Sequence, residues 1–105
     1  MHIKYRIIIT PIARREINKI YDYILEELYA EKAAKQLIQK VEETIQELKC
    51  SPKIYMRIDK LDEVKRRYRR IVIRNFVILY TVDEESKTVY IAHMYYSGRN
   101  YLDLV

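Results

Sequence analysis

Few residues in this chain can form special backbone turns or covalent crosslinks. The 105 residues contain one glycine, two prolines, one cysteine and no tryptophan. The single cysteine, Cys50, excludes an internal disulfide, and no apolar run approaches the ~20 residues that a membrane-spanning helix needs. No positively charged leader followed by an apolar segment opens the chain. We therefore expect a protein of the reducing cytoplasm.

The overall composition predicts a folded, cationic protein. Half of the residues are apolar and 33% are charged, which excludes intrinsic disorder. The length suits one domain, and the chain shows no internal repeat or linker, so we assign residues 1–105 to a single domain. The net charge of +5 predicts an anionic partner, either nucleic acid or an acidic protein.

The first half of the chain has the pattern of a strand followed by two helices. Apolar residues alternate with polar ones from Ile3 to Ile9, as in a strand with one buried face. Thr10 is a suitable N-cap and Pro11 a suitable first helical residue. Apolar residues then recur at helical spacing up to Leu28, and again from Ala34 to Leu48. The short break between these two patterns predicts an antiparallel helical hairpin.

The second half predicts three consecutive antiparallel strands between Tyr68 and Tyr96. Asn75 suits the first turn because asparagine tolerates positive φ, and the polar run 83–87 suits the second. Residues 53–67 lack a period and predict an irregular loop. Gly98 predicts a backbone turn that returns the tail toward the sheet.

These elements together predict an α+β fold. We expect an antiparallel sheet of about four strands, covered on one face by the N-terminal helical hairpin. The other sheet face would remain free for a ligand. Along the first strand of the meander, arginines occur on an otherwise apolar sheet, and this basic face is the feature most in need of a function.

Three segments of the sequence resemble the RelE/ParE superfamily of bacterial toxins from type II toxin–antitoxin modules. They are the helix opening TPIARREINKIYDYI, the sheet segment YRRIVIRNFVILYTVDEESKTVYI and the closing YYSGRNYLDL. The resemblance covers essentially the whole chain and implies the order β-α-α-β-β-β. It also implies a growth-inhibiting protein that a cognate antitoxin neutralises. RelE-like members cut mRNA in the ribosomal A site, whereas ParE-like members poison DNA gyrase.

A ribosome-dependent, metal-independent endoribonuclease would need cations near the phosphate and a group that transfers a proton. On this reading the catalytic residues are Arg70, Arg99, Tyr96 and Tyr101. The RNA-binding residues are Arg66, Arg67, Arg69 and Arg74. We expect no metal site and no cofactor, because the two histidines are remote in sequence and His93 lies within a strand pattern typical of a hydrogen-bonded sheet residue.

The match to the RelE branch is partial. Arg69 and Arg99 fall where that branch carries basic residues. Two further basic residues of that branch are missing here, because Ile71 and Val77 stand near their places. The segment FVILY and the tail are more similar to the ParE branch. The arginine run could equally be a solvated strand edge that receives an acidic stretch of the antitoxin. The sequence favours mRNA cleavage slightly; a gyrase poison and a degenerate toxin that only binds its antitoxin stay as alternatives.

Overall fold

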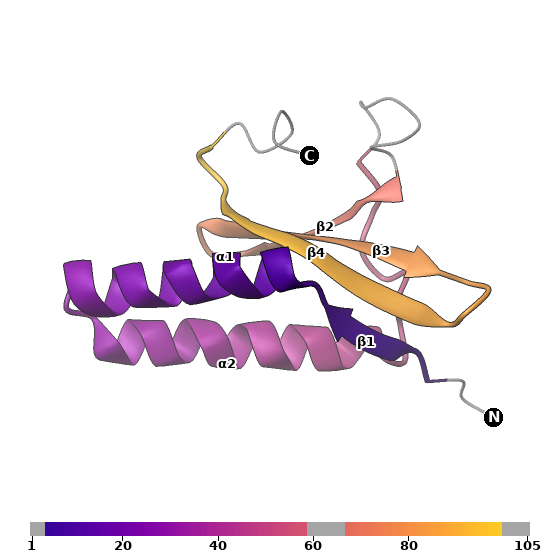
Figure 1. Ribbon diagram of the computed structural model, residues 1–105, viewed down its shortest axis with the longest axis horizontal. Coiled ribbons are helices and arrows are strands. Elements are labelled where there is room, and N and C mark those ends of the chain that lie inside the picture. The colour runs from indigo at the N-terminus through magenta and orange to yellow at the C-terminus, as the bar shows by residue number, and fades with distance from the viewer. Residues whose placement is uncertain (1–3, 59–66, 100–105) are drawn as a thin grey trace.

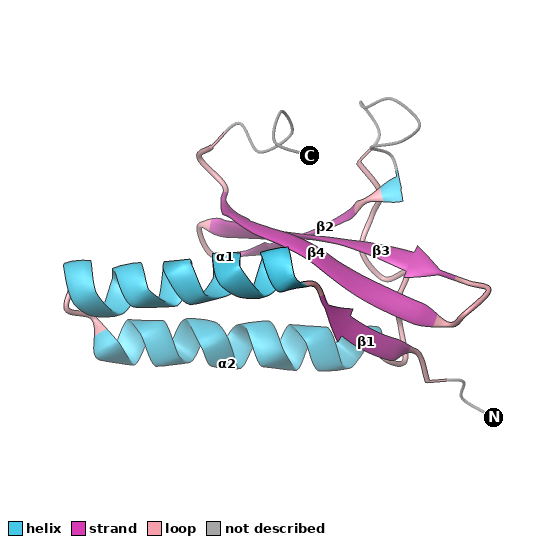
Figure 2. Ribbon diagram, viewed as in Figure 1, coloured by secondary structure: helices cyan, strands magenta, loops and turns pink. Residues whose placement is uncertain are grey.

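The computed structural model describes residues 4–58 and 67–99 and contains a helical hairpin packed on a four-stranded sheet (Figure 1, Figure 2). The order of elements is the predicted one. It runs β1 (Arg6–Ile9), α1 (Pro11–Asp22), the π-helical segment η1 (Tyr23–Glu27), α2 (Glu31–Leu48), β2 (Arg69–Ile73), β3 (Phe76–Asp83) and β4 (Thr88–Tyr96). No helix among these residues has the length and apolar content needed to span a membrane.

The start of α1 confirms the capping residues that the sequence predicts. Thr10 has an extended backbone, its hydroxyl oxygen accepts a hydrogen bond from the Ala13 amide at 3.1 Å, and Pro11 follows as the first helical residue. The same hydroxyl lies 3.2 Å from the Ala92 carbonyl of β4, to which it donates. This one side chain therefore begins the helix and also ties it to the sheet.

The sheet is mixed, which corrects the predicted antiparallel arrangement. The strand order is β1-β4-β3-β2, and β1 pairs with β4 in parallel, with Arg6 opposite Thr88 and Ile9 opposite Ile91. The other pairs are antiparallel, as predicted. Alternation along a strand shows which side chains share a face, but it contains no information on the partner strand or its direction. The long connection through two helices permits the parallel pairing.

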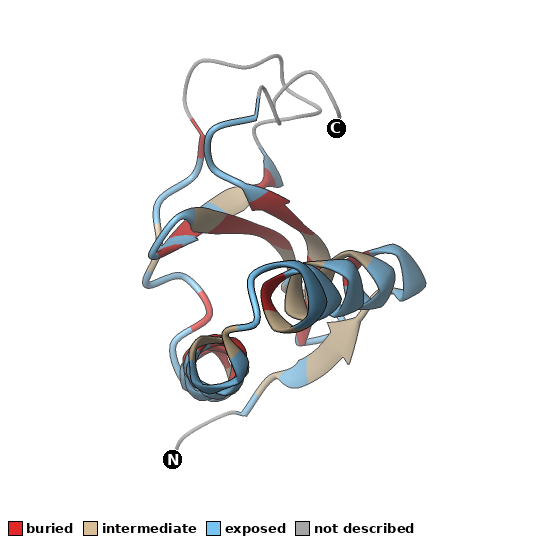
Figure 3. Ribbon diagram, turned by 90° about the vertical axis from the view of Figure 1, so that its left-hand side faces the viewer, coloured by how far each residue is buried: buried red, intermediate tan, exposed pale blue. Residues whose placement is uncertain are grey.

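The main core lies between the hairpin and one face of the sheet, as predicted. Leu37 and Leu48 of α2 are almost fully buried, and so are Ile78 and Ile91 of the sheet. Figure 3 shows that the outer sides of both helices remain exposed. Truncation of a core residue such as Leu37 to alanine would cost about 2–5 kcal/mol, because the rigid sheet beneath it cannot collapse into the cavity.

The opposite face of the sheet is not wholly free, in contrast to the expectation from sequence. A second buried cluster lies there, formed by Ile58, Tyr68, Val77, Leu79 and Tyr95. Val77 and Leu79 of β3 are 1% and 0% exposed. The strand β3 is therefore apolar on both faces, and the second cluster fills part of this face, while Arg70 and Val72 of β2 remain exposed on it.

Residues 53–58, predicted as part of an irregular loop, pair with the outer edge of β2. Arg57 and Arg69 form an antiparallel bridge, and the Arg70 amide donates to the Met56 carbonyl at 3.1 Å. The Arg69 guanidinium donates to the Tyr55 carbonyl at 2.8 Å. This segment covers part of an edge strand that would otherwise present unpaired backbone groups.

Among the residues that the structure describes, three turns place a residue other than glycine at positive φ. The residues are Tyr29 (φ 51°), Arg74 (φ 53°) and Lys87 (φ 54°). The sequence predicted Asn75 for this role in the β2–β3 turn, but the preceding Arg74 adopts the left-handed conformation. Each such residue costs roughly 1–2 kcal/mol relative to a right-handed one. The chain has a single glycine, which occupies none of these three positions, so the folded state carries this cost at each of them.

The only glycine of the chain, Gly98, does not have a positive φ, and it lies close to the ring of Tyr96, which is 51% exposed. A Cβ at Gly98 would lie 2.5 Å from Cε1 of Tyr96. The turn predicted around Gly98 is present, since the Arg99 amide donates to the Tyr96 carbonyl at 3.1 Å.

Glu84 joins three parts of the chain that are distant in sequence. Its carboxylate lies 2.8 Å from Lys53 Nζ and 3.1 Å from Lys87 Nζ, and it accepts a 2.7 Å hydrogen bond from the Tyr5 hydroxyl. These bonds, that from Lys53 above all, lower the pKa of Glu84 to about 2. The charged form is therefore favoured in the folded state.

We predict that Glu84→Gln weakens the acid dependence of stability. The pKa of Glu84 is lower in the folded state than in the unfolded chain. Its contribution to the free energy of unfolding is therefore complete above about pH 4.5 and is lost as the pH falls through about 2. The difference in unfolding free energy between wild type and Glu84→Gln should be largest at neutral pH and shrink across this range. Urea unfolding at a series of pH values measures it.

The matched control is Glu85→Gln, because Glu85 is an exposed carboxylate of the same turn. That variant should follow the wild-type pH profile. A Glu84→Gln difference that stays constant from neutral to acidic pH would contradict this account of the Glu84 bonds.

Candidate functional site

A row of aromatic rings lies on the sheet face opposite the helices. The rings of His93 and Tyr95 stack with centroids 5.1 Å apart and an angle of 16° between their planes. The Tyr68 ring meets His93 edge-on at 6.3 Å. His93 and Tyr95 alternate along β4 with Met94, whose side chain belongs to the core beneath the helices. We call Tyr68, His93 and Tyr95 the aromatic row.

Glu16 of α1 reaches this row from the neighbouring helix. One of its oxygens accepts a 3.1 Å hydrogen bond from the Met94 amide and lies 3.2 Å from His93 Nδ1. The Tyr95 hydroxyl lies 2.9 Å from the same ring nitrogen. The side chains of His93 and Glu16 are only 16% and 21% exposed. His93 is thus a hydrogen-bonded sheet residue, as predicted.

Burial, followed by the nearby Glu16 charge, raises the pKa of Tyr95 to about 12, although Arg99 opposes the change. The phenol is therefore protonated at neutral pH and acts as a hydrogen-bond donor or as a ring for stacking. It is not a base. Within the aromatic row, the imidazole and the phenol are engaged with each other and with Glu16.

Three arginines lie on the same face as the aromatic row. The Arg67 guanidinium carbon lies 5.2 Å from the centre of the Tyr68 ring, and that of Arg99 lies 6.0 Å from the centre of the Tyr95 ring. Arg70 of β2 is opposite Leu79, which is opposite His93, so Arg70 also belongs to this face. The structure therefore brings together Arg67, Arg70 and Arg99 around the aromatic row.

Other residues proposed from the sequence lie elsewhere. Tyr96 is opposite Phe76 in the sheet register and packs edge-on against its ring at 6.1 Å, on the helix-covered side and not beside Arg70. Arg69 is held by the Tyr55 carbonyl. Arg74 lies in the β2–β3 turn, beside α2. Arg66 and Tyr101 lie outside the described residues.

Glu16 is the site residue that sequence reasoning missed, although a signal was present. Ala13, Glu16, Ile17 and Ile20 occur at helical three- and four-residue spacing, so the carboxylate lies along the buried stripe of α1. A charged residue on a buried stripe requires a partner. Here the partners are a backbone amide and a histidine from a strand about eighty positions later in the chain.

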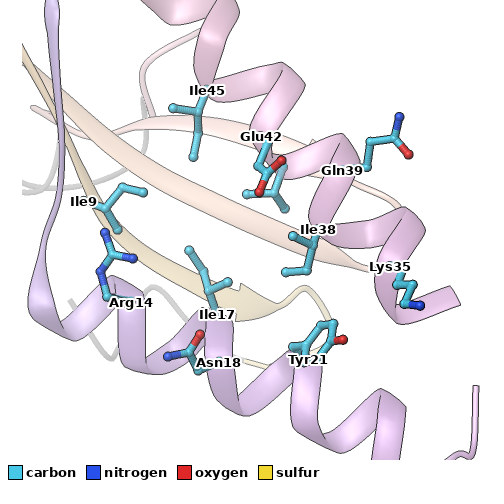
Figure 4. Close-up of a pocket in the computed structure, with 11 residues that line it drawn as sticks. Ile9, Arg14, Ile17, Asn18, Tyr21, Lys35, Ile38, Gln39, Glu42 and Ile45 are labelled. Carbon is cyan, nitrogen blue, oxygen red and sulfur yellow. The ribbon is translucent and has the colours of Figure 1, made fainter. Parts of the chain in front are cut away.

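A second feature is an apolar groove between the two helices (Figure 4). Its volume is about 510 Å³. Ile17 and Tyr21 of α1 line it, together with Ile38 and Ile45 of α2. Charged side chains border it: Arg14, Lys35 and Glu42. Ile45 belongs to the main core, and Ile17 and Tyr21 pack against it, so the groove is the place where this core opens to the surface between the two helices.

The described residues contain no group of three or more His, Cys, Asp or Glu side chains that could hold a metal ion. The chemistry available on the arginine-bearing face is therefore that of guanidinium groups, a phenol and a hydrogen-bonded imidazole. Such a surface can bind an anion or an acidic protein segment.

Comparisons with known proteins agree with the architecture. The family model for the ParE toxin of type II toxin–antitoxin systems, parDE, matches residues 7–101. Among solved structures, the chromosomal ParDE toxin–antitoxin system from P. aeruginosa is similar with a TM-score of 0.70 and 17% identity, covering 89% of this chain and 96% of that chain. No curated protein matches the sequence.

The toxin–antitoxin complex RelBE2 from Mycobacterium tuberculosis is also similar, with a TM-score of 0.60 and 21% identity over 90% of this chain and 92% of that chain. At these identities the two solved structures support the fold, whereas the family model, which spans all elements from β1 to the tail, supports membership. The chain therefore belongs to the ParE toxin family of type II toxin–antitoxin systems, within the RelE/ParE superfamily.

Proposed function

We propose that this toxin arrests growth by binding DNA gyrase through protein contacts, without catalysing a reaction, and that a cognate antitoxin neutralises it in the cytoplasm. One observation favours this over RNA cleavage. Within residues 4–58 and 67–99, the one histidine is His93, and it is engaged by Glu16 and Tyr95. Burial raises the pKa of Tyr95 to about 12, so its phenol is a poor base. The match to the ParE family supports the same target.

Ribosome-dependent mRNA cleavage is the second candidate. It is favoured by the convergence of Arg67, Arg70 and Arg99 on one sheet face. However, cleavage also needs a group that transfers protons near the bound phosphate. Tyr96, the described tyrosine proposed for that role, lies toward the opposite face. This separation is why we rank the nuclease below the gyrase poison.

The groove between α1 and α2 offers the antitoxin a docking surface. Its apolar lining suits an amphipathic helix or an extended segment with apolar anchors. The net charge of +5 on the toxin favours an acidic antitoxin, because opposite charges speed association and exclude wrong partners. We propose that such a segment covers the hairpin and the nearby sheet edge.

The proposed target predicts opposite results in two assays with purified toxin. Supercoiling of relaxed plasmid by gyrase should be inhibited, and adding antitoxin should restore it. Primer extension on programmed ribosomes should show no codon-phased cuts, since His93 beside the arginines is engaged by Glu16 and Tyr96 lies toward the opposite face. Ribosome-dependent cuts that vanish in Arg70→Ala would instead establish the nuclease and reject the gyrase proposal.

The docking groove predicts that Ile38→Glu weakens antitoxin binding about tenfold or more, since it buries a like charge against an acidic segment. Ile38 is half-buried in the groove, so the fold should tolerate the change. Ile12→Glu is the control, because Ile12 is an isoleucine of α1 that is 49% exposed and does not line the groove. Calorimetry measures the antitoxin affinity of both variants. If Ile38→Glu and Ile12→Glu bind the antitoxin equally well, the groove is not the docking surface.

A further inference from the structure

The tip of the helical hairpin carries large apolar side chains that do not contribute to the core. Tyr23, Leu28 and Tyr29 are 57%, 55% and 88% exposed. Figure 1 shows the joined ends of α1 and α2 extending beyond the sheet, at the left of the view. We call these three residues the hairpin tip. Single exposed apolar residues are ordinary, but three within seven positions form a patch of the kind that marks interaction sites.

Tyr29 is in an unfavourable backbone conformation without a folding role for its ring. Its φ is 51°, in the left-handed region where glycine or asparagine is preferred after a helix. The turn is closed by backbone hydrogen bonds from the Leu28 amide to the Tyr23 carbonyl at 3.3 Å and from the Ala30 amide to the Ile24 carbonyl at 3.1 Å. A glycine could form the same bonds. Arg74 and Lys87 adopt the same backbone conformation, but Tyr29 combines it with a large ring that is 88% exposed, and this combination indicates a role outside folding.

The helix leading into the tip is also irregular. The segment η1 is π-helical, and such segments occur often at functional sites because they redirect side chains relative to a regular helix. Here the wider turn immediately precedes Leu28 and Tyr29, and Tyr23 is its first residue. The local geometry therefore presents the three apolar side chains together at the end of the hairpin.

The charge of the tip identifies the chemistry of its partner. Three exposed carboxylates, Asp22, Glu26 and Glu27, lie between Lys19 and Lys32 in a chain whose net charge is +5. Glu31, which follows them, is paired with Lys35 at 2.9 Å. An acidic surface repels nucleic acid, and it also repels the acidic antitoxin that the rest of this toxin favours. The partner that fits is a protein surface with an apolar pocket bordered by basic side chains.

We infer that the hairpin tip is the surface through which the toxin contacts its protein target. This inference rests on the proposed function, since it requires a protein target, and it assigns to that target a surface separate from the antitoxin groove. Tyr29 and Tyr23 would act as aromatic anchors, the residue type that dominates binding energy at protein interfaces. The surrounding carboxylates would orient the partner.

The test is Tyr29→Gly, which removes the ring and the backbone strain together. We expect the thermal midpoint to equal or exceed that of wild type and antitoxin affinity to stay unchanged. The toxin level needed for half-maximal growth arrest, set by inducer titration without antitoxin, should rise about tenfold or more. Tyr29→Asn, which also tolerates the left-handed conformation, should give the same result. The control is Met56→Ser, because Met56 is another exposed apolar residue, at 76%, remote from the tip in the sequence.

Four results would overturn the inference: unchanged growth arrest by both Tyr29 variants, an equal loss in Met56→Ser, a loss of antitoxin affinity, or a lower thermal midpoint in Tyr29→Gly. Failure of the gyrase proposal is distinguishable. If wild type arrests growth without inhibiting gyrase, the target is another protein, and the growth assay still tests the tip. A wild-type chain that does not arrest growth would overturn both.

Discussion

The pairing of β4 is the constraint on which the rest of the structure depends. This strand hydrogen-bonds to β3 along its length, but β1 covers only the part from Thr88 to Ile91 of its other edge. Beyond β1, the start of α1 lies along that edge of β4. The Thr10 hydroxyl donates to the Ala92 carbonyl, and the Glu16 carboxylate accepts from the Met94 amide. The helix is thereby fixed to the sheet by polar bonds as well as by the apolar core, and an exposed edge is avoided.

The same edge contact shapes the chemistry of the neighbouring face. Glu16 is placed by its bond to the β4 backbone, and from there it also meets His93. Burial, followed by the Glu16 charge, raises the pKa of Tyr95. The carboxylate that satisfies a backbone amide thus also holds His93 of the aromatic row in a hydrogen bond. The engagement of His93 by Glu16 and Tyr95 supports the proposal that the arginine-bearing face binds a partner.

Three surfaces of different character lie on separate parts of this small domain. The arginine-bearing face is cationic and aromatic, the groove between the helices is apolar, and the hairpin tip is apolar with an acidic border. A toxin must recognise both a target and an antitoxin. Surfaces that differ in charge and polarity suit partners of different chemistry, which is how one small domain can keep two partners apart.

By itself, the sequence determined the element order, the Thr10 cap, the apolar stripes of the two helices and the presence of arginines on the sheet, since all of these depend on local spacing and backbone chemistry. The superfamily resemblance was also carried by local motifs. Only the tertiary structure decided that β1 pairs in parallel with β4, that Tyr96 lies away from Arg70, that Arg74 and not Asn75 takes positive φ, and that Glu16 meets His93. These features depend on contacts between residues far apart in the chain, where strand alternation gives a side chain's face but neither its neighbour nor its direction.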